Sequence, residues 1–303
     1  MREECFVTEE TAGDRIDKFL AEQYEDLSRS FLQKLLKSGE VMVNGRPVKA
    51  SYKAAEGDTI SFEVPEAVEP EIVPEDIPLD ILYEDHDVIL VNKPKGMVVH
   101  PAAGHYTGTL VNALMYHCKE DLSGINGVLR PGIVHRIDMD TTGVIIACKN
   151  DLAHNSIAAQ LKEHSITRRY QAIVHGVLKD DEGVIDAPIA RLGAGAKRAV
   201  RPDGRRAVTH YRVEQAAEGR ALIRLRLETG RTHQIRVHLA HIGCPICGDY
   251  LYGRELPELK DRFALHSARL RCVQPVTGET VEVVEPLPET LKALLTSSVC
   301  LLT

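Results

Sequence analysis

An acidic, proline-rich stretch at residues 65–80, PEAVEPEIVPEDIPLD, constrains the fold more than any other feature of the sequence. Its four prolines restrict the backbone, and it shows neither the 3.6-residue period of a helix nor the two-residue period of a strand. The stretch therefore predicts a stiff, extended connector. Because 303 residues are enough for two domains, we expect a small domain at 1–64 and a larger one at 81–303.

The composition is typical of a globular protein, with 44% hydrophobic and 27% charged residues. The N-terminal segment is polar, and no apolar run approaches the length of a membrane span, so we expect neither a signal peptide nor a membrane contact. Seven scattered cysteines argue against a disulfide framework and for a reducing compartment. We expect a cytoplasmic protein, and a monomer because no long exposed apolar face is evident.

The net charge of -7 hides an uneven distribution of charge along the chain. Residues 66–90 hold nine Asp or Glu and no Lys or Arg, whereas residues 191–240 hold twelve Lys or Arg against four Asp or Glu. Local patches rather than the total determine the field that a polyanion meets. The basic run allows a nucleic-acid partner, although a solvated surface would explain the run equally well.

The first part of the chain shows two helical periods followed by strand signals. Residues 16–24 and 29–38 place apolar residues on one helical face, and Ser28 and Gly39 are suited to begin and end the second helix. The sequence VMVNGRPV predicts a hairpin around an Asn-Gly turn, and GDTISFEV predicts a further strand. We expect two helices and then a small sheet that ends near residue 64.

The order LSRSFLQKLLKSGEVMVNGRPV resembles the small RNA-binding domain named after small-subunit ribosomal protein four, over roughly residues 14–64. The resemblance implies that the second helix, with Arg29, Lys34 and Lys37, lies against the RNA backbone. Judged by charge alone, these would be ordinary solvated side chains. The domain holds nine basic and thirteen acidic residues, so any RNA contact must be confined to one face.

The larger part mixes strand and helix signals, with strands in the majority and mostly joined by short turns. It predicts an α+β domain with a central, mostly antiparallel sheet flanked by helices. Helical periods fall in GTLVNALMYHC, DLAHNSIAAQLKEHSI, RTHQIRVHLAHIG and EPLPETLKALL.

Polar residues crowd the start of one apolar strand in VHRIDMDTTGVIIACKN, residues 134–150. A buried carboxylate at Asp138 would be costly unless it were paired and hydrogen-bonded. Thr141 and Thr142 could supply hydrogen bonds, and an arginine could supply the charge. A structural turn aspartate is the alternative on this stretch alone, and Asp140 fits that description better, as a turn or surface residue.

A metal site is the next alternative. Asp138, Asp140 and His135 suggest a metal-dependent nuclease, but no third acidic ligand is nearby. A second set has the spacing of zinc ligands, although a Gly and a Pro interrupt it, and small core cysteines are the better interpretation. That set is His238, His241, Cys244 and Cys247. Phosphate-loop and dinucleotide motifs are absent, so the chain offers no obvious cofactor site.

One carboxylate, several arginines, an aromatic residue and no cofactor suit the isomerisation of a base in RNA. The glycosidic bond must break, the base must turn, and a carbon–carbon bond must form. A carboxylate near the sugar can act as nucleophile or base. A neighbouring arginine keeps it ionised, and an aromatic face holds the extruded base.

Four blocks of sequence resemble the RluA family of pseudouridine synthases, and within it the RluD-like branch that acts on large-subunit ribosomal RNA. The blocks are NKPKGMVVHP, HRIDMDTTG, RRYQAIVHG and LETGRTHQIRVHLAHIGCPICGDYLYG. The resemblance extends from about residue 14 to the end. It implies an isomerase that uses no metal and no cofactor. Its partner would be RNA, either 23S-type ribosomal RNA or a ribosome assembly intermediate, with transfer RNA left open.

The resemblance also implies roles for individual residues. Asp138 matches the catalytic aspartate, Tyr170 the tyrosine that packs on the target uracil, and Arg236 the basic partner of the aspartate. Arg136 would help to extrude the base and fill its place, and Arg231 would support the loop or the RNA backbone. The choice between Arg231 and Arg236 as the partner of Asp138 stays open.

Two alternatives from other classes remain. One is a non-catalytic RNA-binding or ribosome-assembly factor, which would have no need for Asp138, Tyr170 and Arg236 together. The other is the metal-dependent nuclease, whose activity a chelator would abolish.

Overall fold

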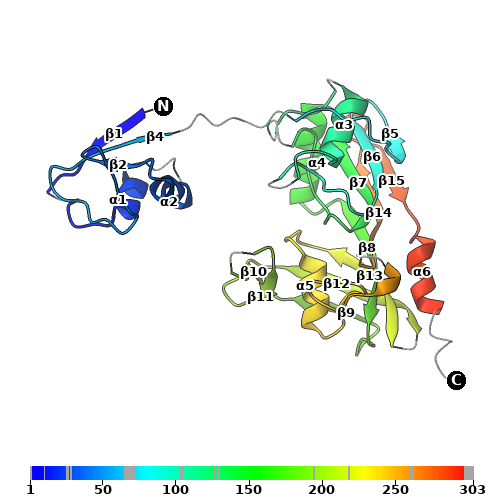
Figure 1. The fold of residues 1–303 in the computed structure, drawn as a ribbon. Coiled ribbons are helices and arrows are strands. Elements are labelled where there is room, and N and C mark those ends of the chain that lie inside the picture. Colours follow the sequence, from blue (N-terminus) through cyan, green and yellow to red (C-terminus); the bar gives the residue numbers. More distant parts are fainter. Residues whose placement is uncertain are drawn as a thin grey trace. The chain divides into compact units, whose positions relative to one another are not determined.

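The computed structural model describes residues 2–9, 11–24, 27, 29–64, 72–102, 105–119, 121–125, 127, 130–193, 195–217, 219–259 and 263–296. The chain divides into two compact units, Met1–Glu69 and Pro70–Thr303. Figure 1 shows the elements of each unit.

The small unit is an antiparallel sheet with the strand order β1-β4-β2-β3 and two helices. Its strands are β1 (Arg2–Phe6), β2 (Met42–Val43), β3 (Arg46–Pro47) and β4 (Thr59–Glu63), and its helices are α1 (Ile16–Gln23) and α2 (Arg29–Ser38). Both predicted helices are confirmed, and their apolar faces form the core with the sheet. Ser28 lies outside the described residues.

The predicted hairpin of the small unit has the expected turn. Asn44 and Gly45 have φ values of 50° and 75°, and two successive residues with positive φ suit the tight turn that joins β2 to β3. Strand β1 was not predicted. Its Cys5 lies opposite Ile60, so its pairing partner is far along the chain and leaves no local signal.

The larger unit is built on a nine-stranded sheet, counted over the described residues, with the order β5-β6-β7-β14-β8-β13-β12-β9 and with β15 paired to β14. The pair β7–β14 is parallel and the other pairs are antiparallel, which confirms the predicted fold class. The bounds are β5 (Ile81–Glu84), β6 (Val88–Lys93), β7 (Thr142–Cys148), β8 (Thr167–His175), β9 (Glu182–Asp186), β12 (Val208–Ala217), β13 (Arg220–Leu227), β14 (Leu265–Val273) and β15 (Thr280–Val284). Strands β10 (Ile189–Arg191) and β11 (Arg198–Val200) form a separate hairpin.

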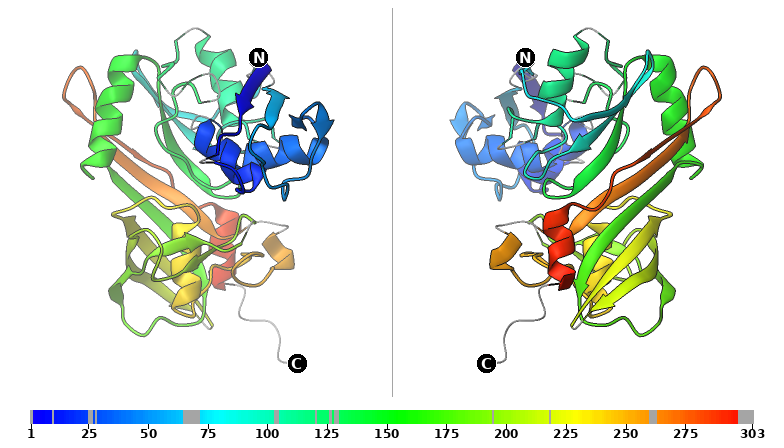
Figure 2. Two further views of the ribbon diagram at one scale, coloured as in Figure 1. Left: turned by 90° about the vertical axis from the view of Figure 1, so that its left-hand side faces the viewer. Right: turned by 90° about the vertical axis from the view of Figure 1, so that its right-hand side faces the viewer.

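Helices flank this sheet where the sequence predicts them. They are α3 (Leu110–Cys118), α4 (Asp151–Lys162), α5 (Gln234–His241) and α6 (Glu289–Thr296), with a short 3₁₀ helix at Pro257–Leu259. Helix α4 contacts β7 and β14, α5 contacts β11 and β12, and α6 contacts β8 and β13. Figures 1 and 2 show α5 and α6 on opposite faces of the sheet.

Residues 72–80 belong to the larger unit, although the sequence assigns them to the connector. Ile72 is buried in the core of that unit. Asn112 Nδ2 donates to Val73 O at 2.8 Å, and Gly108 N donates to Glu75 Oε1 at 3.0 Å. The larger unit therefore begins before residue 81, while residues 65–71 lie outside the described part of the chain.

The two halves of the large sheet meet at the parallel pair β7–β14. Gly143 lies opposite Ser267, with a φ of 102° that side chains rarely adopt. A Cβ atom there would overlap Ser267 O, so this close approach requires glycine. The approach fixes the start of β7, and with it the Asp138 loop, at the middle of the sheet.

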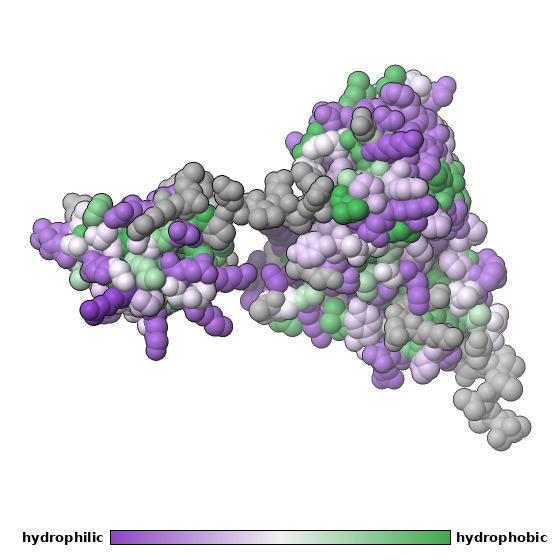
Figure 3. Space-filling model, turned by 45° about the horizontal axis from the view of Figure 1, so that its top comes forward, coloured by the Kyte–Doolittle hydropathy of each residue, from purple (hydrophilic) through white to green (hydrophobic). Residues whose placement is uncertain are grey.

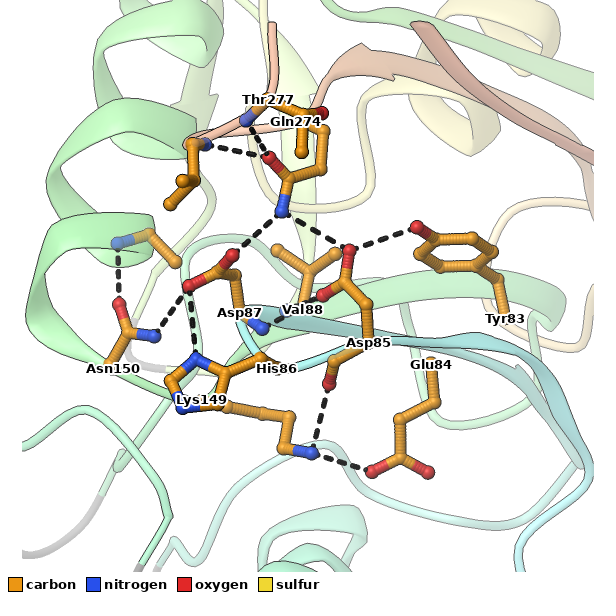
Figure 4. A network of polar contacts seen from close by, with 12 residues as sticks. Tyr83, Glu84, Asp85, His86, Asp87, Val88, Lys149, Asn150, Gln274 and Thr277 are labelled. Atoms are coloured by element: carbon orange, nitrogen blue, oxygen red, sulfur yellow. Dashed lines mark hydrogen bonds and ion pairs between the residues drawn. The ribbon is translucent and has the colours of Figure 1, made fainter. Parts of the chain in front are cut away.

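A polar network ties the β5–β6 turn to two other segments (Figure 4). Asp85 Oδ1 accepts from the main-chain N–H groups of Asp87 and Val88, both at 2.8 Å. Asp87 in turn accepts from Asn150 Nδ2 at 2.8 Å and from Gln274 Nε2 at 2.7 Å. These hydrogen bonds join the turn to the start of α4 and to the β14–β15 turn, so both carboxylates have structural roles.

Among the described residues, no helix is both long enough and apolar enough to span a membrane. The surface visible in Figure 3 mixes polar and apolar residues.

Candidate active site

Asp138 lies in the turn directly before β7, and a buried lysine anchors that turn. Thr141 N donates to the main-chain oxygen of Asp138 at 3.1 Å. Lys93, at the end of β6, is fully buried, and its Nζ donates to Met139 O at 2.8 Å. Two further main-chain carbonyls accept from Nζ at 2.7 and 2.9 Å. The peptide next to Asp138 is therefore held by an ammonium group inside the protein.

The charges around this turn are partly desolvated. Burial lowers the pKa of Lys93 to about 7, against the opposing charges of Asp140 and Asp138. Three carbonyl acceptors match the three N–H donors of an ammonium, so the geometry favours the charged form. Asp140 lies in the turn as expected, but it is buried rather than on the surface. Burial raises the pKa of Asp140, and the charges of Lys93 and Arg236 oppose that rise.

Arg236, in the first turn of α5, is the arginine that pairs with Asp138. Its Nη1 lies 3.1 Å from Asp138 Oδ2. Its Nε and Nη2 donate to the two carboxylate oxygens of Asp249 at 2.8 and 2.9 Å. The side chain of Asp249 is fully buried and that of Arg236 is 3% exposed. One guanidinium is thus shared between a buried carboxylate and Asp138.

Arg236 keeps its positive charge although it is buried. Burial disfavours it, but the hydrogen bonds and charge of Asp249, and then those of Asp138, prevail and raise the pKa of Arg236. Its Cζ atom lies 4.2 Å from the ring centroid of Phe263 and 5.1 Å from that of Tyr252, and such contacts stabilise a cation. The site therefore contains a permanent positive charge.

Asp138 and Tyr170 line one small cavity of about 60 Å³. The Asp138 side chain is 18% exposed, and Tyr170 is buried in β8. Burial raises the pKa of Tyr170, and the charge of Asp138 adds to that rise, so its phenol is protonated at neutral pH. Arg136 and Arg231 also line the cavity, beside Arg236. The structure thus brings all five predicted catalytic-domain residues together.

A basic hollow adjoins this cavity. Arg231 lines both, and its Nε donates to Arg206 O at 3.0 Å. The hollow has a volume of about 410 Å³ and is also lined by Arg191, Arg198 and Arg205. The larger unit therefore has a carboxylate beside a groove that is lined by four arginines and one acid, Asp203, and whose excess of positive charge suits phosphate groups.

Some predicted contacts of the Asp138 loop are not formed. Thr142 Oγ1 lies 2.8 Å from His266 Nδ1 instead of binding Asp138. The Thr141 N–H donates to the main-chain oxygen of Asp138 and not to its carboxylate. Three members of the set with zinc-like spacing have other surroundings. His238 contacts Thr209 Oγ1 and Ala187 O, both at 2.9 Å, and Cys244 and Cys247 are buried in the hydrophobic core. In the described part of the chain, no three His, Cys, Asp or Glu form a metal-binding group.

In the small unit, the basic residues of α2 stay predictions. Lys34 and Lys37 are exposed, which allows an RNA contact. The side chain of Arg29 lies outside the described residues.

The sequence reasoning missed Asp249, Lys93 and Tyr252. All three lie within the quoted sequence blocks, but which acid pairs with a buried arginine depends on the fold and leaves no local pattern. Tyr252 Oη accepts from Arg198 N at 2.8 Å and lies 2.8 Å from His233 Nδ1. It therefore joins the β10–β11 hairpin to the start of α5.

Comparison with known proteins defines the class of enzyme. Residues 87–241 match the family described as RNA pseudouridylate synthase, and residues 14–60 match the S4 domain. The chain belongs to the RNA pseudouridine synthases, which are isomerases, and it carries an RNA-binding S4 domain before the catalytic domain.

The similar proteins share nearly the whole chain. One is an uncharacterized RNA pseudouridine synthase of Bacillus subtilis, 51% identical over 95% of both chains. Another, from Zymomonas mobilis, is named ribosomal large subunit pseudouridine synthase D and is 46% identical over 96% of both chains. The solved structure of human RNA pseudouridylate synthase domain containing 1 covers 70% of this chain and 84% of its own, with 25% identity and a TM-score of 0.56.

Proposed function

We propose that this enzyme converts specific uridines of 23S-type ribosomal RNA to pseudouridine, with Asp138 as the catalytic residue and the target base turned out of its strand. The RNA would be free or in a ribosome assembly intermediate. The name of the Zymomonas mobilis relative supports a large-subunit substrate. The observation that carries the catalytic assignment is the 3.1 Å contact between Asp138 Oδ2 and Arg236 Nη1 at the cavity.

The reaction needs a carboxylate that stays ionised in a pocket with little water. The N1–C1′ bond of the uridine breaks, the uracil turns, and a C5–C1′ bond forms. A proton leaves C5 and N1 gains one, so the product is an isomer and no redox partner is required. Asp138 acts near the sugar as nucleophile or base, and the guanidinium of Arg236, whose Nη1 lies 3.1 Å from Asp138 Oδ2, holds the carboxylate in position.

Extruding a base costs a few kcal/mol, which binding must offset. Tyr170 forms the wall against which the uracil packs, since its neutral, buried ring is a suitable face. Arg136 is exposed and lines the cavity, so it can enter the place that the base leaves. Arg231 and its groove hold phosphates. Arg29, Lys34 and Lys37 of the S4 domain add backbone contacts.

We also infer that the enzyme works as a monomer in the cytoplasm. The six described cysteines are free, which suits a reducing compartment.

The substitution Asp138→Asn tests the catalytic assignment, because it keeps the size of the side chain and removes the carboxylate. Release of tritium from RNA labelled at uracil C5 reports the reaction. We expect the variant to lose activity and to bind RNA as the wild type does, while a control at the exposed Asp180, Asp180→Asn, keeps both. Measurable pseudouridine formation by Asp138→Asn would refute the role.

The substrate assignment is tested separately, by mapping pseudouridines after purified enzyme is incubated with large-subunit ribosomal RNA or with transfer RNA. We expect modification of the ribosomal RNA. Modification confined to transfer RNA would overturn the substrate and leave the catalytic role standing. If the wild type bound RNA but modified neither, a non-catalytic assembly factor would be the better interpretation.

A further inference from the structure

The sheet face opposite the cavity carries a cluster of arginines. Successive side chains of a strand point to opposite faces, so Arg169 projects away from the face on which its neighbour Tyr170 lines the cavity. Residues directly opposite one another on paired strands share a face, and the register places four further arginines on the same face as Arg169. This cluster, the arginine face, consists of Arg169 (β8), Arg212 (β12), Arg224 and Arg226 (β13) and Arg269 (β14).

The arginine face contains cross-strand pairs of like charge. Arg169 lies opposite Arg226 on one side and opposite Arg269 on the other, and Arg212 lies opposite Arg224. Side chains at such positions have Cβ atoms about 4.5–5.5 Å apart, and like charges there destabilise a sheet. The sheet therefore contains three cross-strand pairs whose charges repel one another.

Acidic neighbours neutralise only part of this charge. Arg224 pairs with Glu214 at 3.5 Å and Arg269 with Glu282 at 2.7 Å. Arg169, Arg212 and Arg226 form no ion pair with any described residue. Burial, followed by the charges of Arg269 and Arg224, lowers the pKa of Arg169. Glu182 also lines the hollow and lies opposite Arg212 on β9, without an ion pair between the two. Glu282 also acts on Arg169 through its charge. Positive charge nevertheless exceeds negative charge on this face, with Arg169, Arg212 and Arg226 outside any ion pair among the described residues.

The surface around these residues is concave and open to a partner. Four of the five arginines line a hollow of about 570 Å³ between β8, β9, β12 and β13; they are Arg169, Arg212, Arg224 and Arg226. Helix α6 lies on the same face, where Lys292 and Leu295 line a neighbouring hollow together with Arg169 and Arg224, and α5 covers the other face (Figures 1 and 2). Arg212 and Arg226 are exposed, so the hollow is accessible.

We propose that the arginine face binds the phosphate backbone of RNA at a second contact area, separate from the cavity that holds Asp138. Guanidinium groups bind phosphate through two parallel hydrogen bonds, and a polyanion would relieve the repulsion of the three like-charge pairs. A large folded RNA can reach both faces of the sheet, whereas a short hairpin seated at the cavity cannot. The second area therefore favours large RNAs. This inference rests on RNA as the substrate, and not on which uridine is modified.

The test replaces the three unpaired arginines together, in the variant Arg169→Gln/Arg212→Gln/Arg226→Gln. The matched control removes the same charge at exposed lysines outside the face, in the variant Lys119→Gln/Lys162→Gln/Lys179→Gln. Binding of a long folded fragment of large-subunit ribosomal RNA is measured by filter binding at several salt concentrations. Each lost phosphate contact reduces the slope of log affinity against log salt by about 0.7–0.9, so we expect the arginine variant to have a slope shallower by about 2–3, and the control one close to the wild type.

Two further measurements separate this role from a structural or catalytic one. Because the substitutions remove like-charge pairs, we expect the arginine variant to melt no lower than the wild type. We also expect unchanged tritium release from a short hairpin substrate. Loss of activity on the hairpin would mean that these arginines serve the catalytic cavity, and this would overturn the inference without touching the role of Asp138.

A salt slope equal to that of the control variant would overturn the proposal. The proposal would also be overturned if the arginine variant bound naked RNA as the wild type does but no longer bound assembled ribosomal particles. The arginine face would then bind an acidic protein of the particle instead of RNA. If the triple variant does not fold, Arg226→Gln alone replaces it, with an expected change in slope of about one and the same refuting outcome.

Discussion

Asp249 is the residue whose replacement best tests the charge arrangement of the site. Its carboxylate holds Arg236 through two hydrogen bonds, at 2.8 and 2.9 Å, and also accepts from Leu251 N and Tyr252 N. The substitution Asp249→Asn keeps the shape of the side chain but removes its charge and one acceptor. The charge of Arg236 would then be balanced by Asp138 alone.

The size of the effect follows from burial. Removing one partner of a buried ion pair costs about 3–5 kcal/mol, because the other charge is left without compensation. Here Asp138 still lies 3.1 Å from the guanidinium, and the asparagine keeps one oxygen acceptor, so we expect the lower end, about 3 kcal/mol. For a unit the size of Pro70–Thr303, each kcal/mol lowers Tm by about 2–4 °C, which gives a decrease of about 6–12 °C.

The matched control is Asp203→Asn. Asp203 binds Arg201 with the same two-point geometry, at 2.9 and 3.1 Å, but the two side chains are 65% and 47% exposed. Water screens such a pair, so we expect no measurable change in Tm. The thermal transition of the larger unit is followed by calorimetry, since the two units can unfold separately. Equal Tm values for Asp249→Asn and the wild type would refute the reasoning about Arg236.

Two other substitutions probe the surroundings of Asp138. Lys93→Met leaves three main-chain carbonyls without their donor and releases the peptide beside Asp138. An unsatisfied buried acceptor costs about 1–3 kcal/mol, so we expect a lower Tm and slower tritium release, with Lys162→Met as the control; unchanged values for both would contradict this role. His135 accepts from Ile146 N through Nε2, and burial, followed by the charge of Arg168, lowers the pKa of His135 to about 3. Below about pH 6.5, the ordinary pKa of histidine, the unfolded chain binds a proton that the folded chain refuses. Stability therefore falls as the pH drops from 6.5 toward 3, by at most about 1.4 kcal/mol per pH unit. We expect the free energy of unfolding, measured with urea across this range, to depend less on pH for His135→Gln than for the wild type. An equal dependence would show that the pKa of His135 does not account for it.

The sequence was sufficient wherever the deciding interactions are local. The apolar period at 29–38 and the Asn44–Gly45 turn predicted α2 and the β2–β3 hairpin, because side-chain spacing and backbone φ are properties of neighbouring residues. Pairings between distant segments were not predictable. Strand β14 lies at the centre of the large sheet between β7 and β8, yet its position depends on segments more than 90 residues before it.

At the site, too, local motifs identified the residues, whereas their pairing depended on the fold. Asp138, Tyr170 and Arg236 were singled out from motifs, and the structure brings them together at one cavity. The sequence left open whether Arg231 or Arg236 pairs with Asp138, because both arginines come shortly after the same strand. In the structure, Arg236 lies at the start of α5, points into the interior and pairs with Asp138. Arg231 lies exposed in the preceding loop.

The pairing of one arginine with two carboxylates bears on how reactive Asp138 can be. Were Arg236 balanced by Asp138 alone, the carboxylate would be neutralised by a buried, permanent cation and would be a weak nucleophile. Asp249 already takes two hydrogen bonds from the guanidinium, so the three groups together carry one net negative charge. Asp138 makes the weaker contact and is the more exposed of the two acids. In the mechanism we propose, the surplus negative charge is therefore available at the carboxylate that faces the substrate, while the buried pair keeps that carboxylate in position.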